Sequence, residues 1–306
     1  MNAKVAGVLG CVAAACICAA QDSDLHMTFE NYWLAQPSTR GLGERLCWIQ
    51  LTDDFTPHLS VTNTYLLMPS RDLLDETYVK YTSGLTEVRA GRFRSGFGIS
   101  EWSDYYYNAI IALPIVRFNR LQPYLGLTRF DTGLDVRSIV GPVEYQVGMV
   151  DTDSGAWQWA PKNPDFGVAR LQTHFGALIV GASALGRVAG SKDEDDTEAY
   201  GVDFRWTADH LQMRGELVRL HSGDGWSGGY YVDAFLRPPG LYRTQVGVRA
   251  QAVDSLAGAV SQTYTVGVRQ IVTPNLSATL NYGTGSGPAS KSLSGWSFEI
   301  STTFHF

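Results

Sequence analysis

The C-terminal stretch WSFEISTTFHF, residues 296–306, has the pattern that most clearly indicates the class of fold. Apolar and polar residues alternate along it almost one by one, and a β-strand turns successive side chains to opposite faces. One face would carry mostly aromatic and aliphatic side chains, from Trp296 to Phe306. The other face would carry serine, threonine, glutamate and histidine. A strand with two such unlike faces separates an apolar environment from a polar one.

The same alternation recurs along most of the chain after residue 40, for example in LSATLNY at 276–282 and YGVDFRW at 200–206. It predicts sixteen strands, although a count of 14 or 18 is also compatible with the pattern. The predicted ranges are 26–34, 45–54, 58–67, 74–82, 86–94, 127–139, 143–151, 166–174, 177–187, 197–206, 210–220, 229–237, 242–252, 260–271, 275–282 and 294–306.

Alternating strands suit either a soluble antiparallel sandwich or a membrane barrel. Three features favour the barrel. Arginine, glutamine and acidic residues recur on the polar face, aromatic residues gather at strand ends, and short connections alternate with long ones such as 152–165. Bacterial barrels have short turns at one end and long loops at the other. The sequence therefore predicts an all-β, transmembrane, antiparallel up-and-down β-barrel.

Composition excludes several other classes of protein. No apolar run in the 306 residues approaches the roughly 20 that a spanning helix needs. The formal net charge of −6 gives a nucleic-acid partner no electrostatic support. The 32 glycines and the aromatic content of 12% suit many short strands joined by turns.

Residues 1–20 have the pattern of a secretory signal peptide. Lys4 precedes an apolar run, and Cys18-Ala19-Ala20 forms a small-residue cleavage site before Gln21. A lipoprotein signal ending at Cys11 is the alternative, but the apolar run before it is short. We therefore expect a mature barrel over 21–306, in which Cys47 is alone and no internal disulfide can form.

Catalytic signatures are sparse. The six histidines form no spaced metal pair with cysteine or carboxylate, and the glycine-rich stretch at 283–287 is not a nucleophile elbow. A barrel esterase that uses His174 or His305 with a serine of the lumen is a remaining alternative. We expect no enzymatic activity, no metal and no cofactor.

Strand parity turns many charged residues toward the lumen in nearly balanced numbers. The arginines are Arg89, Arg137, Arg170, Arg205, Arg214, Arg243, Arg249 and Arg269. The acids are Glu87, Asp135, Glu144, Asp203, Glu216, Asp233 and Glu299. A turn at 207–209 would place Asp203 across from Arg214. Arg243, Arg249 and Arg269 are candidates for a basic stripe that orients solutes.

The longest irregular stretch, near 95–122, follows the fifth predicted strand. Long loops in compact folds are usually functional or disordered, and this one is too apolar at Ile110–Ile115 to remain in water. We expect it to fold into the barrel, with its apolar part on the wall and with Glu101 and Asp104 facing Arg243 or Arg269 across a constriction. The alternative is an external loop that packs on a neighbouring subunit.

Two sets of residues resemble a known family. The segments LDETYVKY (74–81), VRAGRF (88–93) and FGI (97–99) resemble the early strands of bacterial outer-membrane porins of the O and P type. That resemblance implies a sixteen-stranded trimer with the loop after strand five inside the lumen. The terminal Phe306 resembles the signal read by the outer-membrane assembly machinery. The longest charge run, 192–196, is acidic, which departs from the phosphate-selective members.

Together these features predict a channel in the bacterial outer membrane, in contact with its lipid, through which small hydrophilic solutes or ions diffuse passively. The alternative is a substrate-selective channel for an anionic or sugar-like solute. A closed structural or adhesive barrel is a third possibility, which would need a plugged lumen.

Overall fold

The computed structural model describes residues 24–35, 43–68, 71–94, 96–99, 109–111, 130–151, 166–188, 198–222, 225–254, 260–287 and 294–305. These ranges contain sixteen strands: β1 (Asp24–Ala35), β2 (Gly43–Thr56), β3 (Leu59–Met68), β4 (Arg71–Ser83), β5 (Thr86–Arg94), β6 (Phe130–Val140), β7 (Val143–Asp151), β8 (Phe166–Phe175), β9 (Leu178–Arg187), β10 (Glu198–Thr207), β11 (Leu211–Ser222), β12 (Gly225–Leu236), β13 (Thr244–Asp254), β14 (Val260–Thr273), β15 (Leu276–Ser286) and β16 (Gly295–His305).

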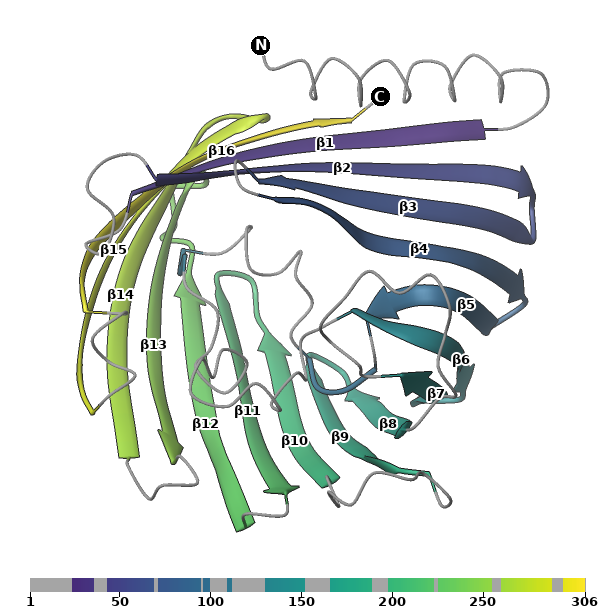
Figure 1. Ribbon diagram of the computed structural model, residues 1–306. Coiled ribbons are helices and arrows are strands. Elements are labelled where there is room, and N and C mark those ends of the chain that lie inside the picture. The colour runs from purple at the N-terminus through teal and green to yellow at the C-terminus, as the bar shows by residue number, and fades with distance from the viewer. Residues whose placement is uncertain are drawn as a thin grey trace.

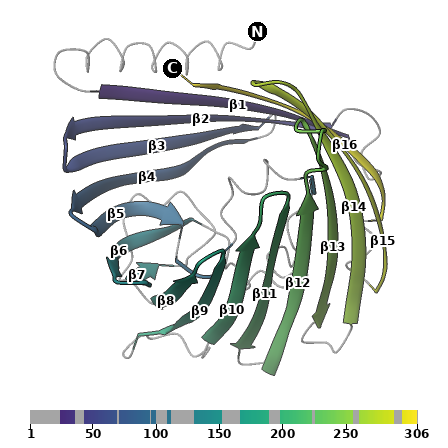
Figure 2. The same ribbon diagram turned by 180° about the vertical axis from the view of Figure 1, so that it is seen from behind.

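The strands form one closed antiparallel barrel in chain order (Figure 1; Figure 2). Closure is made by β1 and β16, which lie side by side and pair in register from Thr28 with His305 to Ala35 with Phe298. A closed barrel leaves no edge strand with unpaired backbone groups. The predicted fold class is confirmed, with a strand count of sixteen rather than 14 or 18.

Each predicted strand overlaps an observed one, and the largest boundary differences are at the start of β12 and at the end of β15. The start of β12 shows a packing effect. β12 begins at Gly225, whereas the pattern predicted a start at 229. Glycines usually indicate a loop, but a side chain at Gly228 would overlap the carbonyl oxygen of Val218 on β11. Gly228 therefore lets two strands approach closely, and the strand continues through it.

Three of the tight turns depend on glycine. Gly84, Gly141 and Gly176 have φ values of 59°, 60° and 59°, and each is the first of the two residues that connect consecutive strands. No described non-glycine residue has a positive φ. A positive φ at the first turn residue alone is typical of the type II′ hairpin, whose twist matches that of the flanking strands.

The two faces of the barrel wall have opposite character. The outer wall exposes large apolar side chains such as Leu171 (55%) and Val248 (49%), whereas the inner wall buries charged ones such as Asp203 and Asp233. Folded domains in water show the reverse distribution. The described residues include no helix long and apolar enough to cross a membrane.

Candidate functional site in the barrel interior

Charged side chains pair across strands β5 to β8 on the inner wall. Arg89 donates to both carboxylate oxygens of Asp135, from Nε to Oδ1 at 3.0 Å and from Nη2 to Oδ2 at 2.7 Å. Gln146 Nε2 also donates to Asp135. Arg137 forms an ion pair with Glu144, which accepts a hydrogen bond of 2.7 Å from Gln172 Nε2. Most of the charge on this wall is therefore locally neutralised.

An ion pair between Arg170 and Asp203 spans an intervening strand. Arg170 on β8 donates from Nη1 to Oδ2 at 2.6 Å and from Nη2 to Oδ1 at 2.9 Å of Asp203 on β10. β9 lies between them, with Gly181 at the crossing point. A Cβ at Gly181 would lie 2.6 Å from Arg170 Nη2 and 2.7 Å from Asp203 Oδ1. The pair forms because this position has no side chain.

We therefore expect Gly181→Ala to separate Arg170 from Asp203 and to lower the free energy of unfolding by about 3 kcal/mol, because both charges are buried. Gly186→Ala on the same strand is the control, since a Cβ there meets nothing within 4 Å. Urea unfolding of the refolded protein measures both. Equal costs for the two variants would contradict this account of Gly181.

A three-residue cluster, Arg214–Asp233–Arg249, lies on β11, β12 and β13. Asp233 is fully buried. It accepts hydrogen bonds from Arg249 Nε at 2.6 Å and Nη2 at 2.7 Å, and from Arg214 Nε at 3.0 Å. Two arginines thus share one carboxylate, and their guanidinium groups lie over the rings of Tyr231 and Phe235.

The predicted pairing of Asp203 with Arg214 is wrong. Asp203 lies opposite Glu216, and Arg214 lies opposite Arg205. The reason is the turn: β10 continues to Thr207, and the connection is 208–210 instead of 207–209. This later turn moves the register along β11, so Arg214 binds Asp233 while Asp203 binds Arg170.

The five residues predicted for a constriction lie in different surroundings. Glu101 and Asp104 fall outside the described residues. Arg249 is held in the buried cluster with Asp233. Arg269 faces inward, and its Nε and Nη2 donate to Ser277 Oγ at 3.2 and 3.1 Å. Arg243 is exposed in the turn before β13, with Nη1 3.4 Å from Val272 O.

Arg243 was predicted to be in a strand because Tyr242 continues the alternation of β13. The structure instead extends the turn that starts at Pro238. Leu241 N donates to Pro238 O at 3.0 Å, and Thr244 N donates to Leu241 O at 2.8 Å. Two successive turns therefore delay β13 until Thr244. The structure places Arg249 and Arg269 on the inner wall and leaves Arg243 at the rim.

The short segment 96–99, just after β5, is attached to the inner wall of β9 and β10. Gly98 N donates to Ser183 Oγ on β9 at 2.9 Å. Phe97 is buried, and a Cβ built on Gly201 of β10 would lie 3.2 Å from its ring. Phe97 belongs to an apolar cluster of buried side chains, whose other members are Phe93, Val150, Phe166, Val168, Leu185, Ala199, Val218, Leu220, Tyr231 and Val253.

A second segment, 109–111, is attached to a different part of the inner wall. Asn281 on β15 donates from Nδ2 to Ala109 O and accepts from Ile111 N, both at 2.6 Å. A side chain at Gly267 would overlap Ala109 O, and a Cβ at Gly247 would lie 3.0 Å from Ala109 Cβ. We call Gly247, Gly267 and Asn281 the Asn281 clamp. Its residues lie in one cross-strand row on β13, β14 and β15.

The residues of the Asn281 clamp, together with Gly181 and Ser183, did not appear among the sequence candidates. One signal was available for part of this set. Gly247 and Gly267 occupy polar-face positions inside strands, where glycine often marks the close approach of another backbone. The role of Asn281 has no comparable signal, because an asparagine on the polar face is ordinary in an alternating strand.

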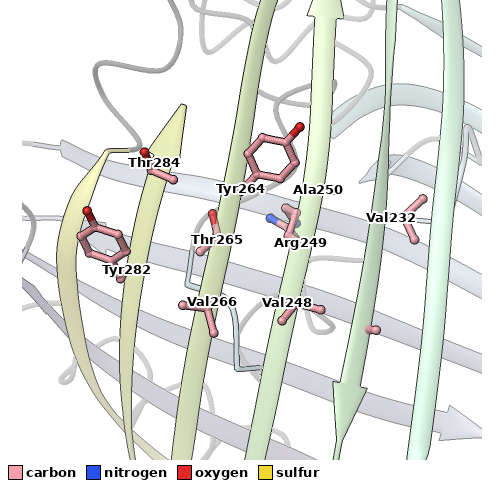
Figure 3. Close-up of a pocket in the computed structure, with 10 residues that line it drawn as sticks. Val232, Val248, Arg249, Ala250, Tyr264, Thr265, Val266, Tyr282 and Thr284 are labelled. Carbon is pink, nitrogen blue, oxygen red and sulfur yellow. The ribbon is translucent and has the colours of Figure 1, made fainter. Parts of the chain in front are cut away.

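A shallow apolar hollow on the outer wall is unrelated to this interior. It lies over β12 to β15 and is lined by Val232, Val248, Tyr264, Val266 and Tyr282 (Figure 3). These side chains lie on the exposed face of their strands. Within the described ranges, no three histidine, cysteine or acidic residues gather to hold a metal ion.

The barrel has the same fold as solved outer-membrane porins. No protein-family model matches the chain, and no curated protein matches it. The similar structures include OmpF of Salmonella typhi in a complex with daunomycin, with a TM-score of 0.66 and 10% identity over 93% of this chain and 97% of that one.

Two further structures show the same likeness. OmpT of Vibrio cholerae, in a trimer form, has a TM-score of 0.62 and 11% identity over 93% of this chain and 99% of that one. A mutant of the Rh. blastica porin has the same TM-score and identity, over 93% and 100%. At such identities the likeness concerns the fold. It does not distinguish the O and P type of porin from other porins.

Proposed function

We propose that this protein is an outer-membrane porin through which small hydrophilic solutes or ions diffuse passively. The observation that carries the proposal is the pair of inward attachments at 96–99 and 109–111, inside a closed barrel with a polar inner wall. A sixteen-stranded barrel is wide enough to enclose an aqueous channel. The chain that joins the two attachments would cross this lumen and narrow it.

Reconstitution into planar lipid bilayers tests the proposal directly. We expect stepwise openings whose conductance is proportional to voltage and rises with salt concentration, as in a water-filled channel. Steps that a particular solute blocks would favour the alternative, a substrate-selective channel for an anionic or sugar-like solute. A protein that inserts without any conductance would contradict both, and would favour a closed structural barrel.

The outer membrane is the proposed location, and its lipid is the proposed surrounding of the outer wall. The large apolar side chains exposed on the described outer wall between β4 and β16 support this, because a barrel in water would expose them to solvent. A signal peptide over 1–20 and recognition of Phe306 by the assembly machinery belong to the same proposal, and both lie outside the described residues. The trimer form of Vibrio cholerae OmpT supports a homotrimer, which cross-linking in the membrane would test.

The membrane location makes a sharp prediction about charge. Val248→Arg places a cation on the outer wall of β13, and we expect it to cost about 2–4 kcal/mol of stability near the bilayer midplane. Thr52→Arg is the control. Thr52 lies on the inner wall, where its Oγ1 is 3.2 Å from Thr62 Oγ1, and an arginine on this wall would face the water of the proposed channel. Unfolding in phospholipid vesicles measures the two costs. The proposed orientation of the wall fails if Thr52→Arg is the more damaging change.

A further inference from the structure

Four polar side chains form one row across the inner wall of β13 to β16. Gln245 lies opposite Arg269, Arg269 opposite Thr279, and Thr279 opposite Glu299. The row is the next inward-facing row after the Asn281 clamp, on the side of the tight turns, because Gln245 precedes Gly247 by two residues at the start of β13. Any solute that passes the segment held by the clamp would meet this row next.

Arg269 is fixed within the row by neighbouring hydroxyl groups. Its Nε and Nη2 donate to Ser277 Oγ, which in turn lies 2.7 Å from Ser301 Oγ. The guanidinium group is thus held in place beside the other members of the row.

Two acceptors in the row are buried. Gln245 is 8% exposed, and its Oε1 has no hydrogen-bond partner. Glu299 is 5% exposed and lies two strands from Arg269 in the same row. An acceptor buried without a donor is unfavourable for folding. A ligand that donates a hydrogen bond to it would account for such a group.

We propose that this row is a binding subsite for a neutral polyhydroxylated solute, such as a pyranose sugar. Hydroxyl groups of the solute would donate to Gln245 Oε1 and to the Glu299 carboxylate, and one would accept from Arg269. Hydroxyl groups match such a set because each is both donor and acceptor. The row carries one acid and one base, so neither a cation nor an anion gains a net charge attraction. The inference rests on the proposed channel function and specifies its solute.

The test is the open-channel current of the full-length protein in planar bilayers, with glucose as the probe. Glycine betaine is the comparison solute, because it is small and polar but has no hydrogen-bond donor. We expect glucose to reduce the current and add noise beyond its effect on bulk conductivity, and betaine to do neither. Gln245→Leu should weaken the glucose effect about tenfold, as expected for the loss of one buried hydrogen bond. Glu299→Gln should also weaken it, because a neutral amide oxygen is a weaker acceptor than a carboxylate.

Thr303→Val is the control variant, because it removes a hydroxyl group from the same face of β16 outside the row. It should keep the wild-type response to glucose. If Glu299→Gln fails to refold, Gln245→Leu alone is used for the test. This substitution replaces an uncharged side chain and therefore leaves the charges of the row unchanged. Heat-modified electrophoretic mobility verifies folding of each variant.

Several outcomes would overturn the subsite while leaving the channel intact. Equal effects of glucose and betaine on the wild-type current would do so, as would a glucose effect unchanged in both row variants. The row would then only bind water. Block by ammonium ions that Glu299→Gln abolishes, with no glucose effect, would make it a cation site. A wild-type protein with no current would contradict the channel function itself.

Discussion

Asp233→Asn should destabilise the barrel by about 3–5 kcal/mol, because it leaves the buried guanidinium groups of Arg214 and Arg249 without their shared countercharge. Asparagine keeps the shape of the side chain, so the loss reflects charge and hydrogen bonding rather than a cavity. Equilibrium unfolding by urea in detergent micelles or vesicles gives the free energy directly.

The matched control is Asp254→Asn. Asp254 also pairs with an arginine, Arg219, at 3.4 Å, but both side chains are about half exposed. An exposed pair contributes roughly 0–1 kcal/mol because water and salt screen it. We expect the two substitutions to differ by several-fold in cost. Similar costs would mean that water reaches the Arg214–Asp233–Arg249 cluster, so that burial does not set its energy.

Deletion of residues 102–108 should raise the single-channel conductance at least about twofold and increase the size limit for solutes. Only residues 100 and 101 would then connect Ile99 to Ala109, and three residue steps reach about 11 Å. The attachments on β10 and β14 are four strands apart, about 19 Å at the usual strand spacing. Both attachments cannot persist, so we expect 109–111 to leave the Asn281 clamp.

Two further variants separate the causes of this change. Asn281→Leu removes both hydrogen bonds to 109–111 and should reproduce part of the conductance increase without any deletion. A seven-residue deletion within 152–165, the connection after β7, is the control and should leave the conductance unchanged. If the deletion of 102–108 also leaves it unchanged, this segment does not narrow the channel.

The contribution of Glu101 and Asp104 to ion selectivity is measured separately. Replacing Glu101 and Asp104 by Gln and Asn should shift the reversal potential toward anions in a salt gradient. The shift should be larger at low salt, where charges act over a longer distance. An unchanged reversal potential, together with an increased conductance in the deletion variant, would keep the constriction but remove these two acids from it.

Much of the fold could be predicted from the sequence because the decisive pattern is local. A strand in the wall of a barrel meets one environment on each face, so every second residue records which side it faces. The alternation at 296–306 and 276–282 therefore located strands β16 and β15, and the same reasoning located the other strands after residue 40. The glycine of the tight turn at Gly84 is also a local requirement, since a positive φ must be adopted there.

Only the tertiary structure decided which residues meet across the barrel. Register depends on where each turn begins, and a shift of the turn after Thr207 changed the partner of Arg214 from Asp203 to Asp233. Parity likewise says that Gly181 faces inward, but not that an ion pair passes over it. Such contacts join residues that are far apart in the chain, and a two-residue period contains no information about them.

The residues of the candidate site likewise fall into those that a local pattern predicts and those that only tertiary contacts reveal. Sequence reasoning identified Arg249 and Arg269 as inward-facing, because their strands alternate clearly. It could not identify the Asn281 clamp, because the clamp binds a segment 170 positions away in the chain. Nor could it identify the row from Gln245 to Glu299, because that row is formed by four adjacent strands. The strands and their two faces follow from the local pattern of residues. The side-chain pairings follow from the closed barrel, because only closure brings the inward faces of distant strands together.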